Sequence, residues 1–535
     1  MDSASERSER KEHSPGQSFN DSNVDVAARL TAGLDASSLD PQVAAKLRRK
    51  IDFHLMPLMC IMYLMTFADK TTLGQSAVLG IMSDAHLTQN QFNLLGSIFY
   101  ISYLAFEYPQ NLALQRFPVA KWMSINIFIW AVALLAHAAC KSFGALFAVR
   151  FILGAAEAAI TPAFLIVTSM FYTRQEQTRR VGYWFLMNGF AVIFLGFLAF
   201  GVLHTKASTS GFMPWQWLMI ITGLLTLVTA VLFWFWFPDS PTTAYFLTPE
   251  ERVLAVKRIQ VNQTGVENKH WKREQFIETL KDSKVWVMAL FSAISNLLNS
   301  LINQRQLIVN QFGFSVIQTT LIGCVDGVVE IVTIWVGVIL ATSKLGRGYA
   351  GILMFIPAIL GCLLVNLLPS HMKVGLLFGY WLSSTRFWAI MSIDDSRMYS
   401  IAVFGIAPSA IFLGWISTLT SGHTKRITTN AIILIFNAIG NIAGPFVWKK
   451  QYQPRNHVPW ALLAAGCGTS AILLFVLRTI LAMENKRRES EEHDETYDNV
   501  YITHIKADGA TEEKKVDKAF LDLTDKQNRD FRYVL

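Results

Sequence analysis

Long apolar stretches recur along the chain between Ile51 and Ala482, and short polar turns separate them. Each stretch is close to the roughly 20 residues that a helix needs to cross about 30 Å of hydrocarbon. Lipid offers the backbone no hydrogen-bond partners, so each stretch is expected to be helical. In the first part of the chain the pattern predicts six transmembrane helices, at residues 53–73, 92–113, 119–140, 143–171, 180–204 and 215–237.

The apolar pattern breaks at Pro238, where a charged and amphipathic stretch begins that continues to about Lys284. Six more apolar stretches follow, at residues 284–304, 316–341, 349–369, 374–421, 427–448 and 458–482. Six helices, a connector and six more helices suggest an internal duplication. The predicted fold class is therefore an all-α polytopic membrane protein with twelve transmembrane helices in two six-helix bundles. Two bundles of this kind can rock around a central site, which favours a transporter.

The domain boundaries follow from the same pattern. We expect a disordered N-terminal tail at 1–50 and a polar, disordered C-terminal tail at 484–535, because neither is apolar enough to form a core. Between them we predict an N-terminal bundle at 51–237, a connector at 238–283 and a C-terminal bundle at 284–483.

Composition narrows the function further. Of the 535 residues, 52% are hydrophobic and 16% are charged, which is more apolar surface than a soluble domain can bury. The net charge of +8 comes from basic residues in short clusters between apolar stretches, so we expect no nucleic-acid partner. The five cysteines fall inside apolar stretches without disulfide or metal-ligand spacing. We therefore expect no metal and no cofactor.

Lysine and arginine accumulate in alternate loops and in the connector, and such residues resist translocation. This bias predicts that both termini and the connector are cytoplasmic, with Lys449, Lys450 and Arg455 as the main exception. We expect a monomer in the lipid bilayer, most naturally that of the plasma membrane.

Charged and polar residues form stripes on three predicted helices. A charge at mid-membrane costs roughly 2.5–3.5 kcal/mol on insertion scales, so these stripes should face protein or water. In the fourth helix Arg150 and Glu157 share one face. Arg150 is a candidate cation for an anionic substrate, because a guanidinium stays charged and can bind a carboxylate with two hydrogen bonds. The alternative is a structural ion pair with Glu107 or Asp69.

Three carboxylates are candidate proton carriers, namely Glu157 and, one helical turn apart in the eighth helix, Asp326 and Glu330. Any of them could instead balance the charge of an arginine. An amide stripe is a candidate substrate-binding surface, and interhelical hydrogen bonding is its alternative role. It consists of Asn296, Asn299 and Asn303 in the seventh helix with Asn437 and Asn441 in the eleventh.

The motifs together resemble the anion:cation symporter branch of the major facilitator superfamily, especially fungal allantoate permease-like proteins. Asp69-Lys70-Thr71-Thr72-Leu73-Gly74 is similar to the first-span signature of that branch, which usually has Arg at the second position and Asn at the fourth. Further matching positions are Glu107, Pro109 and Asn111, then Arg150, Leu153, Gly154, Glu157 and Ala158, then Pro238 to Pro241, and finally Gly422 to Arg426 with Asn441, Gly444 and Pro445.

The resemblance implies proton-coupled import of small carboxylates such as allantoate, ureidosuccinate, nicotinate or pantothenate. It also implies gating or structural roles for Asp69, Glu107, Arg347, Lys425 and Arg426. Two departures stand out. The loop after the eighth helix reads Ser343-Lys344-Leu345-Gly346-Arg347, without the acidic residue of the usual gating motif. Residues 385–403 place four charges inside the tenth helix, which we interpret as an insertion or an unspliced intron.

The sequence therefore predicts a secondary active transporter for proton-coupled uptake of a small organic anion. One alternative is an exporter of a fungal secondary metabolite, and another is a nutrient receptor that does not transport. No nucleophile with an aligned base and no phosphate-binding loop occurs at recognisable spacing. We therefore expect no catalytic residues and no enzymatic activity.

Overall fold

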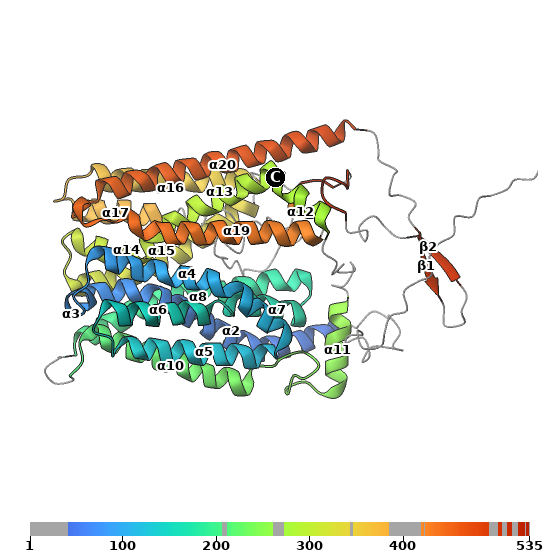
Figure 1. Ribbon diagram of the computed structural model, residues 1–535, viewed down its shortest axis with the longest axis horizontal. Helices are drawn as coiled ribbons and strands as arrows, with labels where there is room; N and C mark the ends of the chain where they lie inside the picture. Colours follow the sequence, from blue (N-terminus) through green and yellow to red (C-terminus); the bar gives the residue numbers. More distant parts are fainter. Residues whose placement is uncertain are drawn as a thin grey trace, which may run out of the picture.

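The computed structural model describes residues 41–205, 211–260, 272–342, 346–384, 419–421, 423–491, 501–505, 511–515, 523–529 and 531–533. These residues are almost entirely helical, apart from a hairpin of β1 (Tyr501–Ile505) and β2 (Thr511–Lys515). The helices lie side by side in two halves, one formed by the first part of the chain and one by the second (Figure 1).

The first half contains seven helical segments and the short helix α3 (Ile81–Asp84). Local signals set several starts: Thr88 forms a capping box with Gln91 before α4, and Ser142 accepts a hydrogen bond from the Ala145 N–H before α6. The segments are α2 (Pro41–Val78), α4 (Gln89–Arg116), α5 (Val119–His137), α6 (Phe143–Glu157), α7 (Ile160–Phe171), α8 (Arg174–Leu203) and α10 (Pro214–Trp236).

The second half begins with a broken helix, in which residues Ser283–Ser300 and Asn303–Gln311 meet at 47°. Its parts are α13 (Ser283–Leu297), η3 (Leu298–Ser300) and α14 (Leu301–Gln311). There follow α15 (Val316–Thr342), α16 (Gly346–Leu367), α17 (Lys373–Ser384), α19 (His423–Ala443), η5 (Gly444–Val447), η6 (Lys450–Tyr452) and α20 (His457–Glu489).

Two connector helices, α11 (Pro249–Gln260) and α12 (Arg273–Leu280), lie at one end of the molecule, whereas α3 and the end of α14 lie toward the other (Figure 1). We call these the connector end and the loop end. Helix α11 contacts α2 and α7 of the first half, and α12 contacts α19 of the second. Each connector helix is therefore fastened to a different half.

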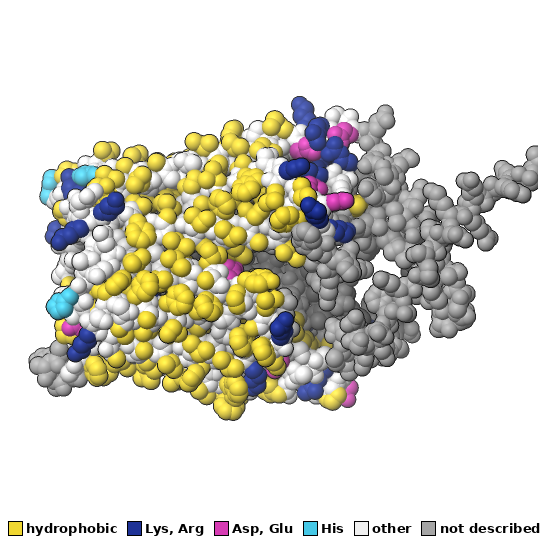
Figure 2. Space-filling view, viewed as in Figure 1, with side chains coloured by type: hydrophobic (Ala, Val, Ile, Leu, Met, Phe, Trp, Pro, Cys, Tyr) yellow, Lys and Arg dark blue, Asp and Glu magenta, His cyan; other side chains and the backbone are white. Residues whose placement is uncertain are grey.

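Seven helices are long and apolar enough to cross a membrane, or eight if the broken pair counts as one span, within the described residues. Hydrophobic side chains cover the flank of both halves, and most lysines and arginines lie near the two ends (Figure 2). The predicted all-α polytopic fold is confirmed. Helices α4, α15 and α16 occupy further predicted spans, which is consistent with twelve spans. The predicted insertion at 385–403 lies outside the described residues.

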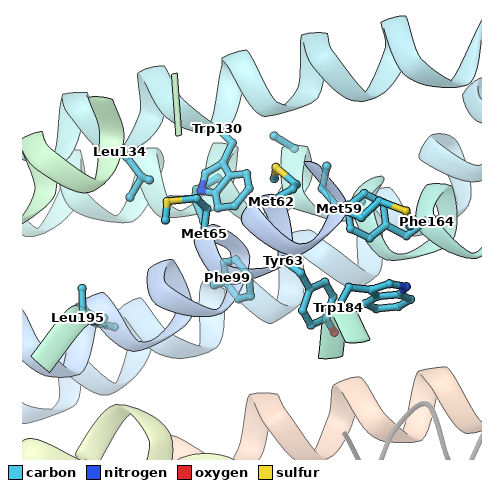
Figure 3. Close-up of a cluster of buried hydrophobic side chains, with 14 of the residues drawn as sticks. Met59, Met62, Tyr63, Met65, Phe99, Trp130, Leu134, Phe164, Trp184 and Leu195 are labelled. Atoms are coloured by element: carbon cyan, nitrogen blue, oxygen red, sulfur yellow. The ribbon is translucent and has the colours of Figure 1, made fainter. Parts of the chain in front are cut away.

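The core of the first half is rich in methionine and aromatic side chains. Met62, Met65 and Leu134 surround Trp130 (Figure 3). Tyr63 packs edge-on against Trp184, with ring centroids 4.6 Å apart. This packing fixes α2 against α5 and α8, and so positions the polar residues one turn further along α2.

Polar contacts join the two halves at the loop end. The Asn93 side chain donates to the Trp448 carbonyl at 2.7 Å, and Ser97 donates to the Ile442 carbonyl at 2.8 Å. Helices α8 and α15 approach closely through glycines: a Cβ on Gly327 would lie 2.6 Å from the Gly189 carbonyl oxygen. The polar contacts therefore hold the two halves together at the loop end.

Two segments differ from the sequence expectation. Helix α2 begins at Pro41, inside the predicted disordered tail, because proline suits the first turn of a helix. Residues 523–533 of the second tail are also not disordered, since they pack on the connector end of the second half. Composition did not indicate that these two segments are ordered, because polar residues become ordered when they find specific partners elsewhere in the chain.

Candidate functional site

A cluster of four charged residues lies inside the first half, two on α2 and two on α6. The Lys70 ammonium is 2.9 Å from Oε1 of Glu157, whose side chain is 1% exposed. Oε2 of Glu157 is also buried, and it has no hydrogen-bond partner among the described residues. Asp69 accepts a hydrogen bond from Trp130 Nε1 at 3.0 Å on α5. Among the described residues, Lys70 is therefore the ion-pair partner of Glu157, and Arg150 acts on it from a greater distance.

Arg150 precedes Glu157 by seven residues on α6, which is about two helical turns. Its side chain is buried, with 3% exposed. The opposite charges that act most strongly on it are those of Asp69 and Glu157. Its Nε and Nη2 are buried without a hydrogen-bond partner in the described part of the chain. The structure thus holds a buried guanidinium with two unused donors, which is an arrangement suited to an anion. Glu107 lies partly buried on α4.

The second half carries a smaller cluster around Asp326 on α15, which is 5% exposed. Trp381 Nε1 donates to one carboxylate oxygen at 2.8 Å and Tyr380 Oη to the other at 3.3 Å. The Arg305 side chain on α14 lies 3.8 Å from Asp326. Asp326 therefore accepts two hydrogen bonds and has one cation nearby, and all three groups favour its charged form.

The two clusters lie on either side of a junction between α2, α14 and α15. Gly323 on α15 lies beside the side-chain amides of Gln306 and Gln75. Gln75 follows Lys70 on α2 by about one turn, and Asp326 follows Gly323 by about one turn. Helix α2 also packs on α14. Charged groups from both halves therefore approach the same central region.

The predicted amide stripe is assembled as one network between α13, η3 and α19. Asn441 donates to Asn296 Oδ1 at 3.2 Å and to Asn437 Oδ1 at 3.0 Å, and it accepts from Asn299 at 2.8 Å. Asn303 is separate, with its Nδ2 beside Gly96 of α4. Four of the five amides thus form one network, and Asn296, Asn299 and Asn441 bond between helices, which is the alternative role that the sequence left open. A substrate-binding role for them stays a prediction.

The remaining predicted residues are Glu330, Arg347, Lys425 and Arg426. Glu330 belongs to α15 and Arg347 to α16, but their side chains are outside the described set. Lys425 is fully buried at the connector end, between Glu278 and Asp282 at 2.6 and 2.9 Å. Its neighbour Arg426 is exposed. No substrate is needed to explain the burial of Lys425, because its charge is already paired.

Two members of the charged clusters have no site role in the sequence prediction. Lys70 stands in a matched motif, but the motif alone does not indicate that it reaches Glu157. Arg305 lies just beyond the predicted seventh span, where it reads as a loop residue, whereas the broken helix carries it onward into the protein. In both cases the missing information was the partner on another helix.

Comparison with known proteins agrees with this architecture. The family model described as Major Facilitator Superfamily matches residues 59–445. The chain is 32% identical to the thiamine pathway transporter of Saccharomyces cerevisiae, over 97% of this chain and 95% of that protein. It is 31% identical to the allantoate permease of the same yeast, over 96% and 90% respectively.

A solved structure of a D-xylose-proton symporter superposes with a TM-score of 0.59 at 12% identity, covering 79% of this chain and 97% of that one. That likeness concerns the fold alone. The two yeast relatives are transporters and the matches to them span nearly the whole chain. The chain therefore belongs to the fungal allantoate permease-like family of the major facilitator superfamily, whose members are multi-pass secondary transporters of small organic solutes and not enzymes.

Proposed function

We propose that the protein imports a small organic anion together with protons, with Lys70 and Arg150 binding the substrate carboxylate and Glu157 carrying the proton. The name of the allantoate permease, a relative that is 31% identical, supports a carboxylate as the substrate class. The connector end faces the cytoplasm in this proposal, because alternate loops on that side hold most lysines and arginines. We place the transporter in the plasma membrane as a monomer.

The observation that carries the proposal is the charge balance of the first-half cluster. Asp69 and Glu157 contribute two negative charges, and Lys70 and Arg150 contribute two positive ones. The empty cluster is therefore neutral, as expected for groups that are buried away from water. A carboxylate that binds Lys70 adds one negative charge and also removes the only ion-pair partner that Glu157 has among the described residues.

Protonation of Glu157 restores neutrality. Burial disfavours an unpaired carboxylate, so Glu157 takes up a proton when the substrate occupies Lys70. Conversely, departure of the substrate returns Lys70 to Glu157 and expels the proton. One proton and one monovalent anion thus move together. Asp326 and Arg305 form a second pair that contacts the other end of the substrate in the second half.

The test is uptake into yeast cells of labelled allantoate, nicotinate, pantothenate and ureidosuccinate. We expect uptake of at least one of them to increase at acidic external pH and to stop when a protonophore is added. Uptake that changes neither with external pH nor with the protonophore would show that transport is not coupled to protons. An outward gradient that alone drives transport would instead favour the exporter, and binding without counterflow would favour the receptor.

Variants separate the roles of the charged residues. Glu157→Gln mimics the protonated state permanently, so we expect exchange of substrate across the membrane to persist while pH-dependent accumulation is lost. Arg150→Ala and Lys70→Met each remove a cation, and we expect a loss of apparent affinity of about 10- to 100-fold, whereas Lys70→Arg should retain much of it. Exposed Lys141→Met is the matched control.

A transporter that reaches the membrane and works normally with Arg150→Ala would refute the assignment of the anion site. Normal pH dependence in Glu157→Gln would refute the assignment of the proton carrier but leave the anion site standing. The two assignments can therefore fail separately.

A further inference from the structure

Residues 523–533, which we call the C-terminal segment, pack against the connector end of the second half. They contact α12, the starts of α13 and α19, and the end of α20. Figure 1 shows this segment next to α12 and α20, well away from the β1–β2 hairpin. A polar tail is thus held against four helices that are far from it in sequence.

Asp525 is the centre of the contact. Its side chain is completely buried, and its carboxylate lies 3.0 Å from the Lys425 ammonium and in direct contact with that of Lys284. Tyr533 also donates its hydroxyl to Asp525. Burial would raise the pKa of Asp525, but Lys284 and Lys425 outweigh it and hold the pKa at about 2. Asp525 is therefore ionised at every physiological pH.

The two lysines need this carboxylate. Lys284 and Lys425 both stand in the first turn of a helix, where the helix dipole disfavours a cation, and both are buried. Lys425 has Glu278 and Asp282 as other partners within 3 Å. Among the described residues, the other partners of Lys284 besides the segment's Asp525 and Tyr533 are Asp282 at 3.5 Å and the Leu419 carbonyl at 3.4 Å. The C-terminal segment thus supplies the nearest partners of Lys284.

The backbone of the segment is recognised as well. Arg488, whose side chain is fully buried, donates to the carbonyls of Phe531 at 2.7 Å and Asp525 at 2.9 Å. Asn485 bonds both the N–H and the carbonyl of Tyr533, at 2.9 and 2.8 Å. The Tyr533 ring lies 4.3 Å from the Lys284 ammonium. Residues of the second half therefore contact the charge, the backbone and the aromatic ring of the segment.

The segment also reaches the connector. Thr524 donates its hydroxyl to Glu278 of α12 at 3.0 Å, and the same glutamate holds Lys425 of α19. Ser421 just before α19 donates to the Leu523 carbonyl at 2.8 Å. The segment therefore bridges the last connector helix to the bundle that follows it.

We propose that the connector end of the second half is a peptide-binding pocket whose occupant is the chain's own C-terminal segment. The pocket selects an acidic residue followed eight positions later by an aromatic one, as in Asp525 and Tyr533. When it is occupied, α12, α13, α19 and α20 are clamped together. When it is empty, the connector is released from this bundle and Lys284 loses its nearest partners. The segment is therefore a detachable intramolecular ligand.

The experiment cuts the segment from the folded, full-length protein. A site-specific protease sequence is inserted between residues 495 and 496, the purified transporter is cleaved in detergent, and release of the C-terminal fragment is followed by size-exclusion chromatography. We expect the fragment to remain bound. With Asp525→Asn we expect release to accelerate by about 100-fold or more, because a buried cation pair loses its anion.

Lys526→Gln is the matched control, because it removes one charge from the adjacent residue, which is 45% exposed and lies 3.7 Å from Asp282. We expect less than about a threefold change from it. Tyr533→Phe should fall between the two variants. A wild-type fragment that dissociates as fast as the Asp525→Asn fragment would overturn the proposal, as would equal effects of Lys526→Gln and Asp525→Asn.

A second measurement requires no substitution in the transporter. A synthetic peptide of residues 519–535 is added to the cleaved wild-type protein, and displacement of the bound fragment is measured. We expect displacement by this peptide and none by the same peptide with Asp525→Asn at equal concentration. Displacement by both peptides alike would show that the carboxylate is not recognised, and would overturn the proposal even if Asp525→Asn impaired folding of the full chain.

Discussion

The connector ends of the two halves pair a basic side chain with acidic ones in different ways. In the first half Arg180, near the start of α8, bonds both oxygens of Asp52 on α2, at 3.0 and 2.7 Å. In the second half Lys425 occupies the corresponding place on α19, and Asp282 before α13 corresponds to Asp52. An arginine facing one acid is thus replaced by a lysine that faces three.

The difference follows from the shapes of the two cations. A guanidinium fork matches one carboxylate with two parallel hydrogen bonds, so the pair is self-sufficient. An ammonium is a point charge with three donors, and when it is buried it needs several acceptors around it. The first half obtains extra support from the connector, where Arg258 of α11 bonds Glu176 at 2.8 Å. The second half obtains it from the C-terminal segment.

The strongest test of this comparison is to delete the cation in each half. Lys425→Met leaves Glu278, Asp282 and Asp525 close together without their shared cation, so we expect a loss of stability of about 3–5 kcal/mol. Arg180→Met leaves one carboxylate that is 30% exposed and should cost less. Thermal unfolding of both purified variants, followed by tryptophan fluorescence, measures the difference. Equal losses would mean that the third acid adds nothing.

Exchanging the type of cation should have a smaller effect. Arg180→Lys keeps the charge but removes one of two hydrogen bonds to Asp52, and we expect a loss of about 1–2 kcal/mol. The conservative variant Asp52→Glu keeps both charges and serves as the comparison in the same unfolding assay. A neutral result for Arg180→Lys would show that the fork geometry is unimportant there.

The connector contact between Lys50 and Glu251 should contribute less than the pairs of Arg180 and Lys425. Both side chains are about one third exposed at a separation of 2.6 Å, so Glu251→Gln should cost under about 1 kcal/mol. The hydrogen bond from Lys50 lowers the pKa of Glu251. The contribution of this ion pair to the free energy of unfolding is therefore complete above the ordinary glutamate pKa. It decreases as pH falls through the lowered pKa of Glu251. Unfolding of wild type and Glu251→Gln at neutral and acidic pH should show the difference shrinking in acid.

We expect binding of the C-terminal segment to be independent of pH near neutrality. The pKa of Asp525 is lowered to about 2, so its contribution is complete above the usual aspartate pKa of about 3.9 and is lost only as pH falls toward 2. Retention of the cleaved fragment should be the same at about pH 5 and pH 8. Release within this interval would mean that another group controls the pocket.

Much of the architecture was predictable because membrane-spanning helices can be recognised from the local sequence. Long apolar stretches and charge-rich loops identify most spans, and helical spacing places Arg150 and Glu157 on one face of α6. These signals depend only on neighbours in sequence. The fold class and the family were therefore predicted correctly from the sequence.

Pairings between distant residues were not predictable in this way. Nothing near Lys70 in sequence indicates that Glu157 lies 2.9 Å away, and nothing in residues 523–533 indicates Lys284 and Lys425. A polar tail resembles a disordered one until its partners are known, because order depends on contacts that composition does not contain. The break after α13, which turns Arg305 toward Asp326, was hidden for the same reason.

The glycine contact between α8 and α15 bears on the rate of conformational exchange. A Cβ on Gly189 would lie 2.5 Å from the Ile331 side chain, and one on Gly196 would lie 2.7 Å from the Cys324 sulfur, so side chains of α15 pack directly on the bare backbone of α8. Because α8 has no side chains at these two positions, the two helices can roll over each other while breaking few contacts. The activation barrier for switching is then concentrated in the polar bonds at the loop end, such as that between Asn93 and Trp448, and the turnover rate of the transporter becomes adjustable there without disturbing the pivot.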